Sequence, residues 1–297
     1  MTPAQLSRTV QHALRRALSA GEVQSLPESQ RVVVESPPRR GAGDYATGVA
    51  FQVAAHTGRP AHEVAVVLCE RLGQEPGIER AEVVGGGFVN VTLDAGACAD
   101  LLRSLVTGPE PEPDQGQGQG QYQGPGARQG PHAPHTVDAD DPARDIPRWA
   151  ALTGEDPAVL AVRTERASSL FRVQYAHARA RSLLRGAERL GFGPEASAVG
   201  AVSSCAVSSG TATHPAPRRL LSLLADRARI TAPGALARHL DAVALAFADF
   251  HDACPPLPSG DEKPGAAHRA RLALAEATGA VLAGGLSRLG VTAPAHI

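Results

Sequence analysis

The sequence has almost no lysine or methionine and few aromatic residues. Lys263 is the one lysine among 29 basic residues, the one methionine is Met1, and only 3% of the residues are aromatic. Any hydrophobic core must therefore consist mainly of leucine, valine and alanine. Such an excess of arginine over lysine is typical of a GC-rich coding sequence, so arginine counts alone are weak evidence for a function.

The chain also has almost no net charge. The formal charge of −1 gives no overall attraction to nucleic acid. Basic residues outnumber acidic ones only in residues 141–297, by 18 to 14. A site for a polyanion is therefore expected in this C-terminal part.

Paired metal ligands and long apolar runs are missing as well. His251 and Cys254 lie three apart, but two ligands do not make a metal site, and none of the four cysteines has metal-ligand spacing. We therefore expect no metal and no cofactor. With no signal peptide and no apolar run near 18 residues, we expect a cytoplasmic protein without a membrane partner.

Residues 108–140 divide the chain. They are rich in proline, glycine, glutamine and acidic residues, with GQGQGQ at their centre and almost no aliphatic side chains. Such a segment cannot bury enough apolar surface to offset the entropy of ordering. This composition predicts a disordered linker between a domain at residues 1–107 and a second domain at residues 141–297.

Residues 1–107 predict an α+β domain, a small sheet with helices. Thr2 and Gln5 form a capping box before an amphipathic helix, and β-branched residues near position 33 indicate a short strand. Asp44 is a suitable N-cap for a helix that carries Val49 and Val53.

Residues 82–93, EVVGGGFVNVTL, predict a strand after the glycines. Alternation places Val89, Val91 and Leu93 on the face that meets the helices, and Phe88 and Asn90 on the outer face. An exposed aromatic ring beside an amide can stack on an unpaired base and read its edge. The alternative is that a loop covers Phe88 and that Asn90 is an ordinary surface residue.

Residues 141–297 predict an all-α bundle of four or five helices. Residues 191–216 have little periodicity and predict a long mobile loop. The expected helices are Ala158–Arg166, Ser168–Leu190, one around residues 220–228, Pro233–Cys254 and His268–Leu286.

The stretch FRVQYAHARARSLLR, residues 171–185, combines an apolar stripe with arginines. The stripe is formed by Val173, Ala176, Ala180, Leu183, Leu184 and Ala187. The remaining surface would carry Gln174, Tyr175, Arg179, Arg181 and Arg185. Arginine beside an aromatic ring suits a partner with phosphates and bases, although a solvated arginine face would have the same pattern.

These segments resemble two domains of arginyl-tRNA synthetases. FRVQYAHARARSLLR is similar to the tyrosine- and arginine-bearing helix of the DALR anticodon-binding domain, and the final GLSRLGVTAPAHI is similar to its closing helix and C-terminal tail. GDYATGVA at 43–50 and GGFVNVTL at 86–93 are similar to the additional N-terminal domain of these enzymes. The arrangement resembles the stand-alone, synthetase-related anticodon-binding proteins of the NrtL type.

The resemblance implies tRNA as the partner, with arginine tRNA as one possibility. It implies that Phe88 and Asn90 contact an unpaired D-loop base, and that the helix with Tyr175, His177 and Arg179 borders the anticodon stem-loop. Tyr175 and His177 could instead tie this helix to its neighbours. The chain departs from the family at Ser168, Ser169, Phe171, Arg172, Gly48 and Ile297, which bears on anticodon specificity.

The signatures of the family's chemistry are not in the sequence. None of the 11 histidines stands in a His-x-Gly-His setting, and a chain with one lysine cannot contain Lys-Met-Ser-Lys-Ser, so the charges that would stabilise adenylate formation are missing. We therefore expect a non-catalytic tRNA-binding protein. The alternative is a regulatory or protein-interaction module that reuses the scaffold without binding tRNA.

Overall fold

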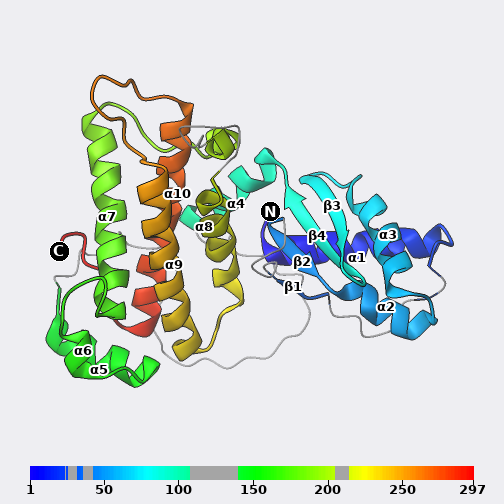
Figure 1. Cartoon of the computed structure of the whole chain (residues 1–297), viewed down its shortest axis with the longest axis horizontal. Coiled ribbons are helices and arrows are strands. Elements are labelled where there is room, and N and C mark those ends of the chain that lie inside the picture. Colours follow the sequence, from blue (N-terminus) through cyan, green and yellow to red (C-terminus); the bar gives the residue numbers. More distant parts are fainter. Residues whose placement is uncertain (24, 26–31, 36–42, 108–139, 205–213) are drawn as a thin grey trace, which may run out of the picture.

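The computed structural model describes residues 1–23, 25, 32–35, 43–107, 140–204 and 214–297, with the side chains of 201–204 excepted. The expected linker lies outside these residues apart from Asp140. An α+β part and a helical part are recognisable in Figure 1. The expected fold class is therefore confirmed. No described helix is long and apolar enough to cross a membrane.

The sheet of the α+β part is antiparallel, with strand order β1-β2-β4-β3. Its strands are β1 (Val34–Glu35), β2 (Tyr45–Thr47), β3 (Ile78–Val84) and β4 (Phe88–Leu93). The turn between β3 and β4 requires glycine at Gly87, because φ is 148° there and an added Cβ would lie 2.8 Å from that of Ala61. This turn fixes the start of β4 and thus the position of Phe88.

Three helices pack with the sheet: α1 (Pro3–Ser19), α2 (Val49–Thr57) and α3 (Ala61–Leu72). The capping box at Thr2 is confirmed, since its side chain accepts from the Gln5 amide at 3.3 Å. The expected N-cap at Asp44 was wrong. Its carboxylate accepts from the Leu93 amide at 2.8 Å, and Gly48 caps α2 without a side-chain bond.

The helical part contains more elements than the sequence predicted. Its helices are α5 (Pro142–Thr153), α6 (Pro157–Leu160), α7 (Ser169–Arg189), α8 (Ala216–Asp226), α9 (Pro233–Ala253) and α10 (Ala266–Leu289), with 3-10 turns η1 (Ala196–Ser204) and η2 (Arg227–Arg229). Helix α5 was not predicted. The helix expected at 158–166 is the single turn α6, and the expected loop at 191–216 includes η1.

Helix α4 (Ala95–Thr107) connects the two parts. It follows β4 in the chain but packs on α10, η1 and α8 of the helical part (Figure 1). Its Leu101 and Leu102 are both buried. The two parts are therefore in direct contact, and the placement of a domain boundary at residue 107 stays a prediction.

Candidate nucleic-acid interface

The outer aromatic of β4 is exposed. Phe88 keeps 51% of its surface accessible, while Val89, Val91 and Leu93 are buried, as the alternation predicted. Phe88 has a partner that the sequence did not suggest, because the ring of Phe51 from α2 lies 5.0 Å away, centroid to centroid. No sequence signal identifies this pair, since the two residues lie on different elements and meet only through the packing of α2 on β4.

Asn90 is not on the accessible surface. The expectation of exposure was wrong, because only 3% of the residue is accessible. Strand β4 is flanked on both sides, with Asn90 opposite Ala46 on β2 and Glu82 on β3. The backbone at Gly43 also lies against it, since a Cβ built on Gly43 would be 3.5 Å from the Asn90 Cβ. In this conformation Phe88 offers a ring to solvent and Asn90 does not offer an amide.

The inner face of α7 agrees with the predicted stripe. Val173, Ala176, Ala180, Leu183 and Ala187 are buried, and α7 packs on α9 and α10. This packing determines which side of α7 can meet a partner.

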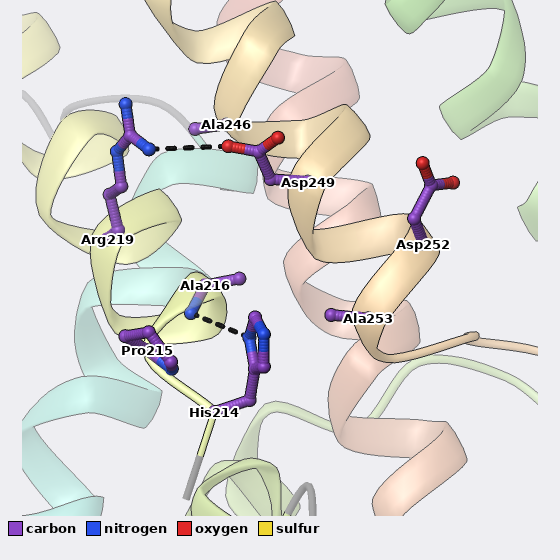
Figure 2. Close-up of a pocket in the computed structure, with 8 residues that line it drawn as sticks. All are labelled: His214, Pro215, Ala216, Arg219, Ala246, Asp249, Asp252 and Ala253. Atoms are coloured by element: carbon purple, nitrogen blue, oxygen red, sulfur yellow. Dashed lines mark hydrogen bonds and ion pairs between the residues drawn. The ribbon is translucent and has the colours of Figure 1, made fainter. Parts of the chain in front are cut away.

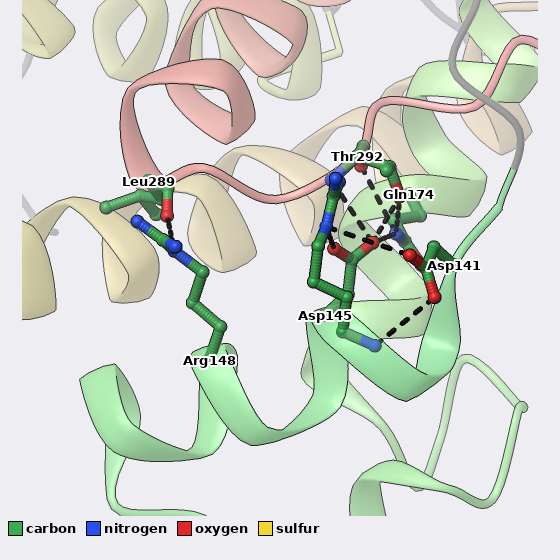
Figure 3. Close-up of polar contacts among 7 residues, drawn as sticks. Asp141, Asp145, Arg148, Gln174, Leu289 and Thr292 are labelled. Atoms are coloured by element: carbon green, nitrogen blue, oxygen red, sulfur yellow. Dashed lines mark hydrogen bonds and ion pairs between the residues drawn. The ribbon is translucent and has the colours of Figure 1, made fainter.

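Gln174 was expected on the surface of α7, and it is buried instead. Its amide nitrogen donates to Asp145 Oδ2 at 3.1 Å and to Thr292 Oγ1 at 3.1 Å (Figure 3). The same carboxylate oxygen accepts from the Thr292 backbone N–H at 3.1 Å. These bonds tie α5, α7 and the C-terminal segment together, and they leave Gln174 Oε1 as a buried acceptor without a partner among the described residues.

The C-terminal segment is held at further points. His177 is buried, and its Nδ1 lies 2.9 Å from the carbonyl oxygen of Pro294. Arg185 donates to the carbonyl oxygen of Ala295 at 3.3 Å, and Arg148 of α5 donates to that of Leu289 (Figure 3). His177 was expected either to border the anticodon stem-loop or to tie α7 to its neighbours. The structure supports the second role, because His177 contacts the segment after α10.

The outward side of α7 carries a row of rings and guanidinium groups. Phe171 and Tyr175 are stacked with centroids 5.8 Å apart. Arg163 lies 5.1 Å from the ring centre of Phe171, and Arg179 lies 5.8 Å from that of Tyr175. Cation–π contacts of this kind keep the arginine side chains extended over the rings. Arg163, which precedes α7, was not predicted as a contact residue, and Phe171 was considered only as a departure from the family.

Arg181 is the freest of the predicted contact residues. It is exposed and makes no hydrogen bond or ion pair with another residue in the described part of the chain. Arg179, by contrast, lies 3.2 Å from His251 Nδ1. Arg181 could therefore bind a phosphate without first breaking an internal contact.

Two hollows lie away from these residues. One, of about 360 Å³, is bounded by His214, Asp249 and Asp252 at the ends of α8 and α9 (Figure 2). Within the described ranges no three His, Cys, Asp or Glu side chains are grouped to hold a metal ion.

The other hollow, of about 390 Å³, lies between the two parts of the molecule and includes Asp44, Cys98 and Arg218. Burial raises the pKa of the Asp44 carboxyl, although the Leu93 amide and Arg218 oppose this shift. Cys98 and His214 both line this hollow, but burial raises the pKa of the Cys98 thiol to about 12, so the thiol stays protonated near neutral pH.

Two family models match separate parts of the chain. Residues 4–93, which include Phe88, match the family described as arginyl tRNA synthetase N terminal domain. Residues 173–297, which include most of α7 and the C-terminal segment, match the DALR anticodon binding domain. The chain contains both domains.

The chain is also similar to curated proteins named as arginine–tRNA ligases. The chain is 45% identical over 112 residues to an arginine–tRNA ligase of Kineococcus radiotolerans, which is 37% of this chain and 20% of that protein. It is 44% identical over 132 residues to the Frankia alni ligase, which is 42% of this chain and 22% of the relative. The chain thus spans about a fifth of the length of the curated relatives it matches.

Proposed function

We propose that this chain is a non-catalytic tRNA-binding protein related to arginyl-tRNA synthetase, of the stand-alone NrtL type. It contacts the D-loop through the Phe88 end of β4 and the anticodon arm through the outward side of α7. The observation that carries the proposal is the presence of both domains in one chain.

The exposed chemistry of each domain supports this assignment. Phe88 offers an aromatic face, which can stack on any unpaired base. Arg181 offers a guanidinium group that can bind the phosphate backbone. Gln174, His177 and Asn90 are buried, so we assign them to the support of these surfaces.

Three facts support the absence of aminoacylation. Residues 94–172 separate the two matched domains. The sequence contains neither His-x-Gly-His nor a second lysine. Without these groups the chain has no means to stabilise charge on ATP phosphates by the mechanism of the ligases.

A titration with total tRNA at about 50 mM salt tests the proposal, since counterion release strengthens binding at low salt. We expect saturable binding, and we expect Phe88→Ala to weaken it by roughly 1–3 kcal/mol through loss of base stacking. Leu245→Ala is the matched control, because Leu245 is an exposed apolar residue on α9 outside both surfaces.

Binding that is equally strong for Phe88→Ala and wild type would contradict the D-loop contact. If no tRNA is bound and a stoichiometric protein co-purifies instead, the protein-interaction alternative would replace the proposal.

A further inference from the structure

We propose that Phe51 is a second base-contacting residue, which forms with Phe88 an aromatic corner for one unpaired base. Gly48 leaves the space in which the two rings can form this corner. This inference rests on the proposed function and adds two residues to its D-loop contact. Neither residue belongs to the outer face of β4 from which a base contact was first expected.

The two rings are close and set at an angle. Their centroids are 5.0 Å apart and their planes meet at 66°, an edge-to-face arrangement. Phe88 is 51% exposed and Phe51 is 39% exposed. Aromatic pairs of this kind usually bury their surface, so two accessible rings in contact indicate a surface that is covered when a partner is bound.

Gly48 is the residue that permits this arrangement. A Cβ built on Gly48 would lie 3.2 Å from Cε1 of Phe88 and 3.6 Å from Cδ2 of Phe51. Its backbone does not require glycine, because φ is −100° and ψ is 18°. The requirement comes from the space beside the rings, where a larger side chain would displace Phe88.

The shape of the corner selects a single planar group. A flat base cannot lie parallel to two rings whose planes meet at 66°, so it stacks on one ring and touches the other. Val84, 39% exposed and directly opposite Phe88 on β3, extends the apolar floor. The two rings bind through their π faces, which tolerate any base, as in other single-strand contacts.

A fluorescent base tests the inference on the whole protein. The probe is a D-arm RNA hairpin with 2-aminopurine in its loop, whose fluorescence falls when the base stacks. We expect quenching by wild type and binding weakened roughly fivefold or more by Phe51→Leu, because leucine keeps the apolar contact and loses the ring. We expect Gly48→Ala to reduce the quenching at saturation, since the displaced Phe88 ring stacks less well.

Val66→Ala is the control, because Val66 is an exposed apolar residue on α3 of the same domain. Thermal melting of each variant separates loss of contact from loss of folding. If Phe88→Leu weakens binding and Phe51→Leu does not, the corner is disproved and the proposed D-loop contact stands. If wild type binds neither the hairpin nor total tRNA, the proposed function fails and the inference fails with it.

Discussion

Gln174 and Asp145 are joined by a hydrogen bond of 3.1 Å between two buried side chains, 29 residues apart in the chain. The bond links α7 to α5. Thr292 of the C-terminal segment accepts a hydrogen bond from Gln174 and donates one to Asp145. A side chain expected to meet RNA is thus part of the support of the anticodon-binding domain.

Gln174→Leu should therefore affect stability more than binding. The change removes the donor to Asp145 and Thr292, and we expect the free energy of unfolding to fall by about 1–3 kcal/mol. Urea denaturation measures the loss. Asp145→Ala should cost more, since the Thr292 amide and Gln174 would both lose an acceptor.

The affinity of the Gln174→Leu variant for tRNA should be measured well below the unfolding temperature of the variant, so that an effect on binding is separated from the effect on stability. We expect an affinity close to that of wild type. An affinity reduced without any loss of stability would show that Gln174 contacts the RNA and that the hydrogen bond is secondary.

The periodicity of apolar residues was sufficient to predict which face of a single helix or strand is buried. The buried stripe of α7 and the alternation of Val89, Val91 and Leu93 depend only on neighbours along the chain, and the structure confirms both. The sequence alone indicated neither the burial of Asn90 nor that of Gln174. The first depends on strands that flank β4 on both sides, and the second on a segment 118 residues away.

Helix α5 was missed for a similar reason. Asp141 and Pro142 give it a local start signal, and the Asp141 side chain accepts from the Arg144 amide at 3.3 Å. Its fully buried residues are Asp145 and Trp149, and a face that buries an aspartate is not marked by an apolar pattern. The indole N–H of Trp149 donates to Ser169 at 2.7 Å. The direct contact of α4 with α10 could not be predicted either, because a single sequence does not indicate which distant helices pack together.

Arg181→Gln should weaken tRNA binding and also its salt dependence. If Arg181 neutralises one phosphate, the slope of log K against log salt should become shallower by about 0.7–0.9. Titrations between about 50 and 200 mM salt measure this slope. Arg15→Gln on α1 is the control, since Arg15 is also exposed and lies on neither β4 nor α7. Equal slopes for wild type and Arg181→Gln would rule out the phosphate contact.

His239 of α9 should make stability depend on pH. Burial lowers the pKa of His239, and the charges of Arg227 and Arg229 act in the same direction, against Asp226 and the Leu223 backbone. As pH falls through about 6.5, the unfolded chain takes up a proton that the folded chain does not, so the folded state loses stability.

Replacing the imidazole should remove this contribution. As the pH is lowered from about 7.5 to about 5.5, we expect the unfolding free energy of wild type to fall by more than that of His239→Gln. Urea denaturation at both pH values measures it, and all other titrating groups cancel in the difference. A difference that is constant with pH would mean that His239 is protonated alike in both states.

Cys98 should report on the contact between α4 and the helical part. Burial, and then the charge of Asp44, raise the pKa of the Cys98 thiol to about 12, and burial raises that of Cys69 on α3 to about 11. Because the thiolate is the reactive form, alkylation of Cys98 at about pH 8 should be slower than in the unfolded chain by on the order of a thousandfold.

Leu274 of α10 lines the same hollow as Cys98, so Leu274→Ala should loosen the packing of α4. We expect this variant to speed alkylation of Cys98 while that of Cys69, which lies on α3 of the α+β part, stays unchanged. Mass spectrometry of the two peptides over time gives both rates from one sample. If Cys98 of the wild type reacts as fast as in the unfolded chain, α4 does not stay docked on α10, and the two parts of the molecule move independently.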